Sequence, residues 1–309
     1  MVTAADIQDA AAGLRGIATR TSLRYVEALG AHLKLENEQP MGAFKIRGAY
    51  NAIRKLPDAV RKRGVITFSS GNHGQAVAYA AKEFGVRAVI VMPETAPAVK
   101  IDGVKHWGGE VVMAGRTSED RRTKAEEIAA REGLAIVPPF DHPDIVAGQA
   151  TVALEIVEQL PEVETVLVPV GGGGLISGVV AGLAAVKSRA KVWGVEPAGA
   201  PKLKRSLEAG HPVRLDRTAS LADGLITLSV GEIPFAHLAA HRDRVAGVAL
   251  VDDDALREAV HFLWQRCHLT VEPSGAATTA AVRSGAVRPV PPTVLVVSGG
   301  NVDPSLLED

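Results

Sequence analysis

The sequence predicts an α/β protein built on two doubly wound, largely parallel sheets. Two observations support this fold class: short apolar runs rich in β-branched residues, and amphipathic helical stretches between most of them. Such alternation is typical of βαβ units, whose parallel strands are buried on both faces. The predicted strands are VITFS (65–69), AVIVM (88–92), EVVMA (110–114), LAIV (134–137), TVLVPV (165–170), KVWGVE (191–196) and TVLVVS (293–298).

Helices are expected where apolar residues recur at the spacing of a helical turn. The segments 46–53 and 77–84 each place four apolar residues at i, i+3, i+4 and i+7, which is the pattern of one buried helix face. Near the N-terminus, Thr3 is followed three residues later by Asp6. A hydroxyl residue with an acid at this spacing predicts a capped helix start.

The chain is expected to form two domains, one of them discontinuous. The alternation of strands and helices is interrupted before Ser69 and again at 138–149, a stretch rich in proline and turn-forming residues. The four strands between these interruptions predict a small domain over 64–141. Residues 1–63 and 142–309 would share a larger sheet, with the ligand in the cleft between the two domains.

Composition and charge favour a soluble cytoplasmic enzyme. Hydrophobic residues make up 47% of the 309 residues and charged residues 22%. The net charge of −1 does not indicate binding to nucleic acid or to an anionic membrane. No apolar run approaches the length of a membrane span, and the N-terminus lacks the features of a secretory signal. The single cysteine, Cys267, excludes an internal disulfide and a thiolate zinc cluster.

Four consecutive glycines, Gly171 to Gly174, join the strand at 165–170 to an apolar helix. Glycine lets the backbone approach a ligand closely, and a helix start offers unpaired N–H groups, so the segment predicts a cup for a phosphate. A tight turn alone needs fewer glycines. A dinucleotide fold is the competing interpretation, since Glu196 ends the next strand, but Ser177 stands where its glycine fingerprint needs a glycine.

Lys45 lies at the boundary between a loop and a helix, flanked by Phe44 and Ile46. A cation at a helix start is poorly placed for the helix dipole, and partial desolvation would lower the pKa of the amine from about 10.4. A lowered pKa is what an amine nucleophile requires. A solvated surface lysine is the alternative interpretation.

Two further turns carry polar groups at strand ends. The turn SSGNHG offers hydroxyl, amide and imidazole groups beside the free N–H groups of a helix start, and it can hold a carboxylate. A single helix cap would explain only one of its four polar residues, Ser69, Ser70, Asn72 and His73. The turn VVSGGN ends the last strand with Ser298, and by itself it indicates only a turn.

Taken together, FKIRGA, SSGNHG, GGGGL, ADG and SGGN resemble, in order and separation, the motifs of the fold type II pyridoxal-phosphate (PLP) enzymes. The similarity is to the threonine/serine dehydratase and serine racemase branch, and it runs from about Thr19 to Asp303. It implies a tryptophan synthase β-like fold, with PLP in the cleft between a large PLP-binding domain and the small domain. It also implies a small amino-acid substrate and a homodimer.

The resemblance implies a role for each matching residue. Lys45 would carry PLP as a Schiff base and later remove the Cα proton, while Ser298 would contact the pyridine nitrogen. The other residues implied to bind the cofactor are Phe44, Asn72, Gly171, Gly172, Gly173, Gly174, Leu175 and Gly224. Those implied to bind the substrate carboxylate are Ser69, Ser70, Asn72 and His73.

A neutral hydroxyl at Ser298 would leave the pyridine nitrogen largely unprotonated, which makes the ring a weaker electron sink. Loss of a β-leaving group from the deprotonated Cα is then favoured over a long-lived carbanion, so elimination is favoured over transamination. The expected reaction is the loss of water from a hydroxy amino acid of the L-threonine or L-serine class, giving a 2-oxo acid and ammonia.

Several features bear on this expectation. Serine racemases use a serine as the acid/base opposite the lysine, so Ser70 keeps racemisation open; the PPFD segment around Phe140 is more similar to the dehydratases. A 3-hydroxyaspartate dehydratase would also fit. The racemase-like members hold a divalent cation with a glutamate, a carbonyl and an aspartate. Glu196 and the Ala200 carbonyl match, but Lys202 stands at the aspartate position, so no required metal is expected.

Other functions stay open on the same scaffold. Cysteine synthase-like β-replacement is disfavoured by FKIRG and GGGGL, because that branch has a different lysine motif and threonines in its phosphate loop. A nicotinamide-dependent reductase and a non-catalytic amino-acid sensor are the remaining alternatives. The short segment after SGGN also leads us to expect no C-terminal regulatory domain, and hence no feedback inhibition by isoleucine.

Overall fold

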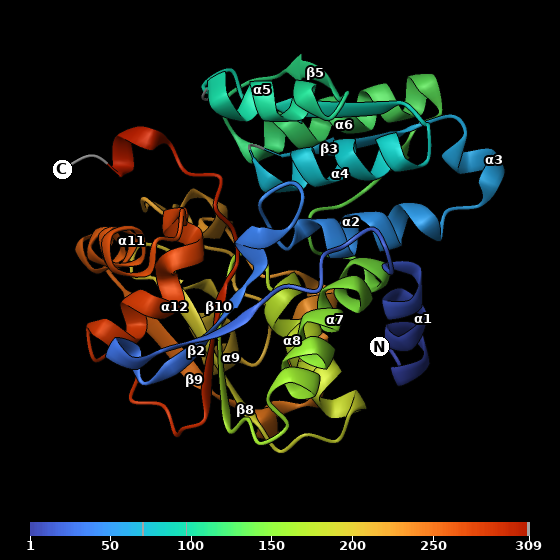
Figure 1. The fold of residues 1–309 in the computed structure, drawn as a ribbon. Helices are drawn as coiled ribbons and strands as arrows, with labels where there is room; N and C mark the ends of the chain where they lie inside the picture. Colours follow the sequence, from blue (N-terminus) through green and yellow to red (C-terminus); the bar gives the residue numbers. More distant parts are fainter. Residues whose placement is uncertain (70, 97, 308–309) are drawn as a thin grey trace.

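Two separate sheets organise the computed structural model, which describes residues 1–69, 71–96 and 98–307 (Figure 1). The larger sheet has the order β1-β2-β10-β7-β8-β9, and every neighbouring pair except β1 and β2 is parallel. Its strands are β1 (Leu23–Val26), β2 (Ala31–Leu35), β7 (Thr165–Pro169), β8 (Lys191–Pro197), β9 (Val245–Val251) and β10 (Thr293–Val297).

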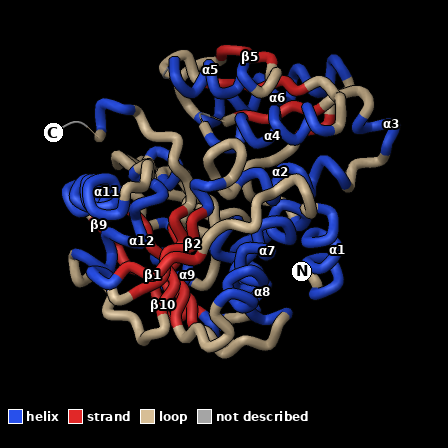
Figure 2. The backbone as a smooth tube through the Cα atoms, viewed as in Figure 1, coloured by secondary structure: helices blue, strands red, loops and turns tan. Residues whose placement is uncertain are grey.

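The smaller sheet has the order β5-β4-β3-β6 and is parallel throughout. Figure 2 shows the helices around the two groups of strands. The predicted class, two largely parallel doubly wound sheets, is confirmed. The domain limits 1–63, 64–141 and 142–309 stay a prediction. The strands of the smaller sheet are β3 (Val65–Phe68), β4 (Ala88–Met92), β5 (Glu110–Met113) and β6 (Ala135–Ile136).

All seven predicted strands are present, but β1, β2 and β9 were not predicted. In β2, Lys34 interrupts the apolar pattern, yet it is fully buried because its ammonium contacts Glu155. In β9, Gly247 breaks the β-branched run; a side chain there would meet the ring of Trp193 at 2.6 Å. Both irregularities have tertiary causes.

Two helices lie where the apolar spacing predicts them. The segments 46–53 and 77–84 fall in α2 and α4, and the capping box of Thr3 and Asp6 begins α1. Within the described ranges, no helix combines the length and the apolar character needed to cross a bilayer. The helices are α1 (Ala4–Gly13), α2 (Lys45–Arg54), α3 (Asp58–Arg61), α4 (Asn72–Glu83), α5 (Ala98–His106), α6 (Ser118–Glu132), α7 (Pro143–Gln159), α8 (Gly174–Ala185), α9 (Lys202–Ala209), α10 (Glu232–Ala240), α11 (Asp253–Cys267) and α12 (Pro273–Arg283).

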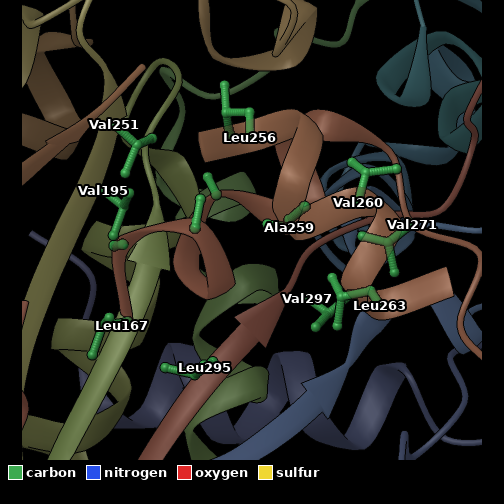
Figure 3. Close-up of a cluster of buried hydrophobic side chains, with 14 of the residues drawn as sticks. Leu167, Val195, Val251, Leu256, Ala259, Val260, Leu263, Val271, Leu295 and Val297 are labelled. Carbon is green, nitrogen blue, oxygen red and sulfur yellow. The ribbon is translucent and has the colours of Figure 1, made fainter. Parts of the chain in front are cut away.

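Both faces of the larger sheet are buried. Alternate residues of a strand point to opposite faces, so Leu167 packs with α11 and α12 while its neighbour Val166 packs with α7 and α8. Figure 3 shows the first of these layers, in which Leu256 and Leu263 of α11 lie against the strands. Each such side chain contributes roughly 1.5–3 kcal/mol when fully buried, which makes this sheet a stable platform.

Helix α2 lies between the two sheets because it packs against both α7 and α4 (Figure 1). Its approach to α7 is so close that a Cβ on Gly148 would lie 2.3 Å from the Arg47 carbonyl oxygen. The buried Arg47 guanidinium then donates to Glu36 at 2.8 Å and to Glu155 at 2.7 Å. This ion network fixes the first turn of α2 against the larger sheet.

Candidate active site

Lys45 is the first residue of α2, and the segment before it is joined to the end of β10. The Phe44 N–H donates to the Ser298 carbonyl at 3.1 Å, and Ala43 forms a bridge with Gly299. The Lys45 ammonium donates to the Pro139 carbonyl at 2.8 Å and lies 5.3 Å from the centre of the Phe44 ring. The lysine and the SGGN turn, far apart in sequence, therefore share one site.

The electrostatic surroundings of Lys45 suit an amine nucleophile. Burial lowers the pKa of Lys45 to about 8, and the carboxylate of Glu272 limits the fall. At neutral pH an appreciable fraction of the amine is therefore unprotonated. The sequence-based expectation of a desolvated lysine, rather than a solvated surface lysine, agrees with this environment.

The glycine loop has no room for side chains at its centre. A Cβ on Gly171 would lie 2.7 Å from the Gly224 carbonyl oxygen, and one on Gly172 would lie 2.3 Å from the Phe140 ring. Gly173 has a φ of +91°, in the left-handed region that glycine tolerates. Because α8 begins at Gly174, the first N–H groups of the helix have no partner within it and can bind an anion.

Asn72 connects the small sheet to the site. Its Nδ2 donates to Glu272 Oε1 at 2.5 Å, and its Oδ1 accepts from Asn301 Nδ2 at 2.8 Å. Asn301 also donates to the Met41 carbonyl at 3.0 Å, close to the lysine segment. The amide of Asn72 is thus held in one orientation by two partners from the C-terminal part of the chain.

Two described residues of the polar turn after β3, Ser69 and His73, have side-chain contacts within the protein. His73 is buried, and its Nε2 contacts the Val137 carbonyl oxygen at 3.0 Å. Burial and the nearby charge of Lys45 together lower the pKa of His73 to about 3, so the ring is neutral. Ser69 Oγ accepts from the Gly71 N–H at 3.2 Å. Ser70, the predicted second catalytic residue, lies outside the described residues.

Gly224 and Ser298 are linked through Ser274, the second residue of α12. The Gly224 N–H donates to Ser274 Oγ at 3.0 Å, and the buried Ser298 Oγ lies 3.5 Å from the Ser274 carbonyl oxygen. Gly224 itself is exposed. The predicted ring-facing glycine and the predicted hydroxyl therefore lie on neighbouring segments at the end of the larger sheet.

Sequence reasoning missed Glu272, the buried residue at the N-cap of α12. Burial raises the pKa of its carboxyl to about 7; the charge of Asp223 adds to the rise and that of Lys100 opposes it. The only sequence signal was an acid before the proline that starts α12. Glu272 belongs to the site because its carboxyl contacts Asn72, which is distant in sequence.

These features fit PLP. The glycine loop packs too closely for side chains and leads into the start of α8, whose first N–H groups have no partner within the helix. The lysine is buried with a lowered pKa, and a buried hydroxyl follows β10. The model of the pyridoxal-phosphate dependent enzyme family matches residues 14–299 of the chain. The chain belongs to this family. Its cofactor is PLP, and its fold is that of the fold type II PLP enzymes.

Relatives of this PLP enzyme carry three related names. It is 38% identical to the L-threonine ammonia-lyase of Thermotoga maritima, over all of this chain and 78% of that protein. It is 40% identical to the L-threo-3-hydroxyaspartate ammonia-lyase of Saccharomyces cerevisiae, over 92% and 87% of the two chains. The structure of maize serine racemase superposes with a TM-score of 0.94 at 36% identity, covering 99% of this chain and 95% of that one.

Proposed function

We propose that this PLP enzyme removes water from a small β-hydroxy amino acid of the L-threonine or L-serine class, releasing a 2-oxo acid and ammonia. The observation that carries the proposal is the position of Lys45, a buried amine with a pKa of about 8. Its ammonium donates to the Pro139 carbonyl, and the next residue, Phe140, packs against Gly172 of the glycine loop. The names of the relatives above support the choice of substrate class.

The reaction draws on the chain's own groups in a defined order. When bound, PLP supplies an aldehyde that attaches the substrate amine and a ring that withdraws electrons from Cα. The substrate carboxylate binds at the start of α4, where the N-cap residue Gly71 has no side chain to accept from the N–H groups of Asn72 and His73. The Lys45 amine then takes the proton from Cα and returns it to the β-hydroxyl, which departs as water. Water then hydrolyses the released enamine, through its imine tautomer, to the 2-oxo acid and ammonia.

The remaining residues position and tune the cofactor. Gly171 to Gly174 and the N–H of Leu175 hold its phosphate, and Asn72, oriented by Glu272 and Asn301, contacts the ring oxygen. Ser298 offers a neutral hydroxyl to the ring nitrogen, which favours elimination over transamination. Phe44 and Gly224 would pack against its ring.

Serine racemisation is the second candidate, and the close superposition on maize serine racemase favours it. The experiment is a panel of L-threonine, L-serine and L-threo-3-hydroxyaspartate, scored for 2-oxo acid and for inverted amino acid, with wild type and Ser70→Ala. We expect 2-oxo acid to be the main product, and Ser70→Ala to remove only inversion. Absence of 2-oxo acid from all three substrates would refute the proposed elimination.

The oligomeric state and the location belong to the same proposal. We expect a homodimer, as the resemblance to the dehydratase and racemase branch implies, and a cytoplasmic location, as composition and charge favour. Light scattering after size-exclusion chromatography measures the mass directly. A mass equal to one chain of 32.3 kDa would contradict the dimer.

A further inference from the structure

A buried ammonium lies behind the glycine loop in a cage made only of oxygens. Lys202 Nζ donates to Leu225 O at 2.8 Å, to Val170 O at 3.0 Å, to Glu196 Oε1 at 3.1 Å and to Ala200 O at 3.2 Å. The side chains of Lys202 and Glu196 are both fully buried. Every partner is an oxygen that accepts a hydrogen bond. Such a set of oxygens resembles the ligands of a bound cation more than the surroundings of an ordinary helical lysine.

The position of Lys202 needs a special explanation. It is the first residue of α9, where the helix dipole disfavours a positive charge. Burial lowers the pKa of Lys202, and the Glu196 carboxylate opposes that fall. Glu196 also accepts the N–H groups of Leu203 at 2.8 Å and Lys204 at 3.0 Å, so the carboxylate is held for this contact.

The cage joins the two loops that face the cofactor. Val170 directly precedes Gly171, and Leu225 directly follows Gly224. These two glycines are themselves in contact, since a Cβ on Gly171 would lie 2.7 Å from the Gly224 carbonyl oxygen. One ammonium therefore binds the residues on either side of that contact.

The site around Lys202 does not fit the divalent cation that the resemblance to racemase-like enzymes implies. Magnesium and calcium bind oxygens at about 2.0–2.6 Å, and here an ammonium at 2.8–3.2 Å occupies the centre of the oxygens. Across the described parts of the chain, no group of three or more His, Cys, Asp or Glu residues could hold a metal ion.

We propose that Lys202 is a built-in cation that replaces a bound metal ion and holds the phosphate loop and the Gly224 turn together. Lys202 is a positioning residue: it acts on the cofactor through Val170 and Leu225. The enzyme then needs no free cation for cofactor binding, whichever hydroxy amino acid is its substrate.

The test begins with Lys202→Ala, which empties the cage, and uses chloride salts of potassium, ammonium or tetramethylammonium at equal ionic strength. In tetramethylammonium we expect the Tm of the PLP-loaded chain to fall by about 5–10 °C. The Kd for PLP should rise about tenfold. Potassium or ammonium should restore at least half of both losses, because these ions can enter the emptied cage.

Two control variants separate the cage from general effects. Lys202→Met fills the cavity with an uncharged chain of similar length, which leaves the buried Glu196 carboxylate unpaired and no room for an ion. This variant should therefore lose stability and gain nothing from potassium. Lys204→Ala removes an exposed lysine of the same helix and should behave as wild type. Equal rescue of Lys202→Ala by tetramethylammonium, or a folded Lys202→Ala that neither small cation restores, would overturn the proposal.

A measurement on the wild type decides the question even when Lys202→Ala does not fold. The Tm and the Kd for PLP should be the same in potassium and in tetramethylammonium, and the same with magnesium or a chelator. Specific stabilisation by any of these cations, or a weaker Kd for PLP in chelator, would show that the built-in charge does not replace a metal ion.

Discussion

Replacing Glu272 by glutamine should change how the stability of the cofactor-free chain depends on pH. The pKa of this buried carboxyl is raised from 4.5 to about 7 in the folded chain, which corresponds to about 3 kcal/mol. The folded state therefore binds the Glu272 proton more tightly than the unfolded state. The resulting stabilisation is fully present below pH 4.5 and is lost as the pH rises through about 7.

Urea unfolding of wild type and Glu272→Gln at several pH values from 5 to 8 measures this effect. The variant keeps the oxygen that accepts from Asn72 and cannot ionise. Its stability relative to wild type should therefore rise by about 2–3 kcal/mol across this range. The exposed Glu258→Gln is the matched control and should show a constant difference. A difference for Glu272→Gln that also stays constant between pH 5 and 8 would refute the reasoning.

Three other predictions test separate parts of the site. Lys45→Ala should abolish the Schiff-base absorbance band and lower kcat at least about 10³-fold, and a variant that keeps both would contradict the assigned lysine. Gly172→Ala should raise the Kd for PLP by tenfold or more, measured by fluorescence titration, because the new Cβ would lie 2.3 Å from the Phe140 ring. Arg47→Met should cost about 3–5 kcal/mol in urea unfolding, because it leaves the buried Glu36 without its cation; a loss below 1 kcal/mol would show that this network does not hold α2.

Much of the site was visible in the sequence because its chemistry depends on local residue types. The run Gly171 to Gly174 needs the absence of side chains, and the structure shows that Cβ atoms would collide there. Lys45 at a helix start already indicated an unusual amine, and its pKa is indeed lowered. Five short motifs in order then implied the family, which the comparisons show.

The residues that were missed depend on contacts between distant segments. Glu272 looked like a helix-capping acid, and only its packing beside Asn72, 200 positions away, made it part of the site. Strand β2 was not predicted because a lysine at position 34 is typical of a surface residue. In the fold, the Glu155 carboxylate pairs with the charge of Lys34. Such contacts leave no periodic signal, so reasoning from local pattern could not find them.

The sequence by itself determined the class of fold and the positions of seven strands, because hydrophobic periodicity acts over a few residues. Only the tertiary structure decided where the buried charges go. Desolvation and charge pairing depend on what surrounds a group in space. The same lysine side chain therefore has a lowered pKa at 45, belongs to an ion network at 34 and is a built-in cation in our proposal for 202.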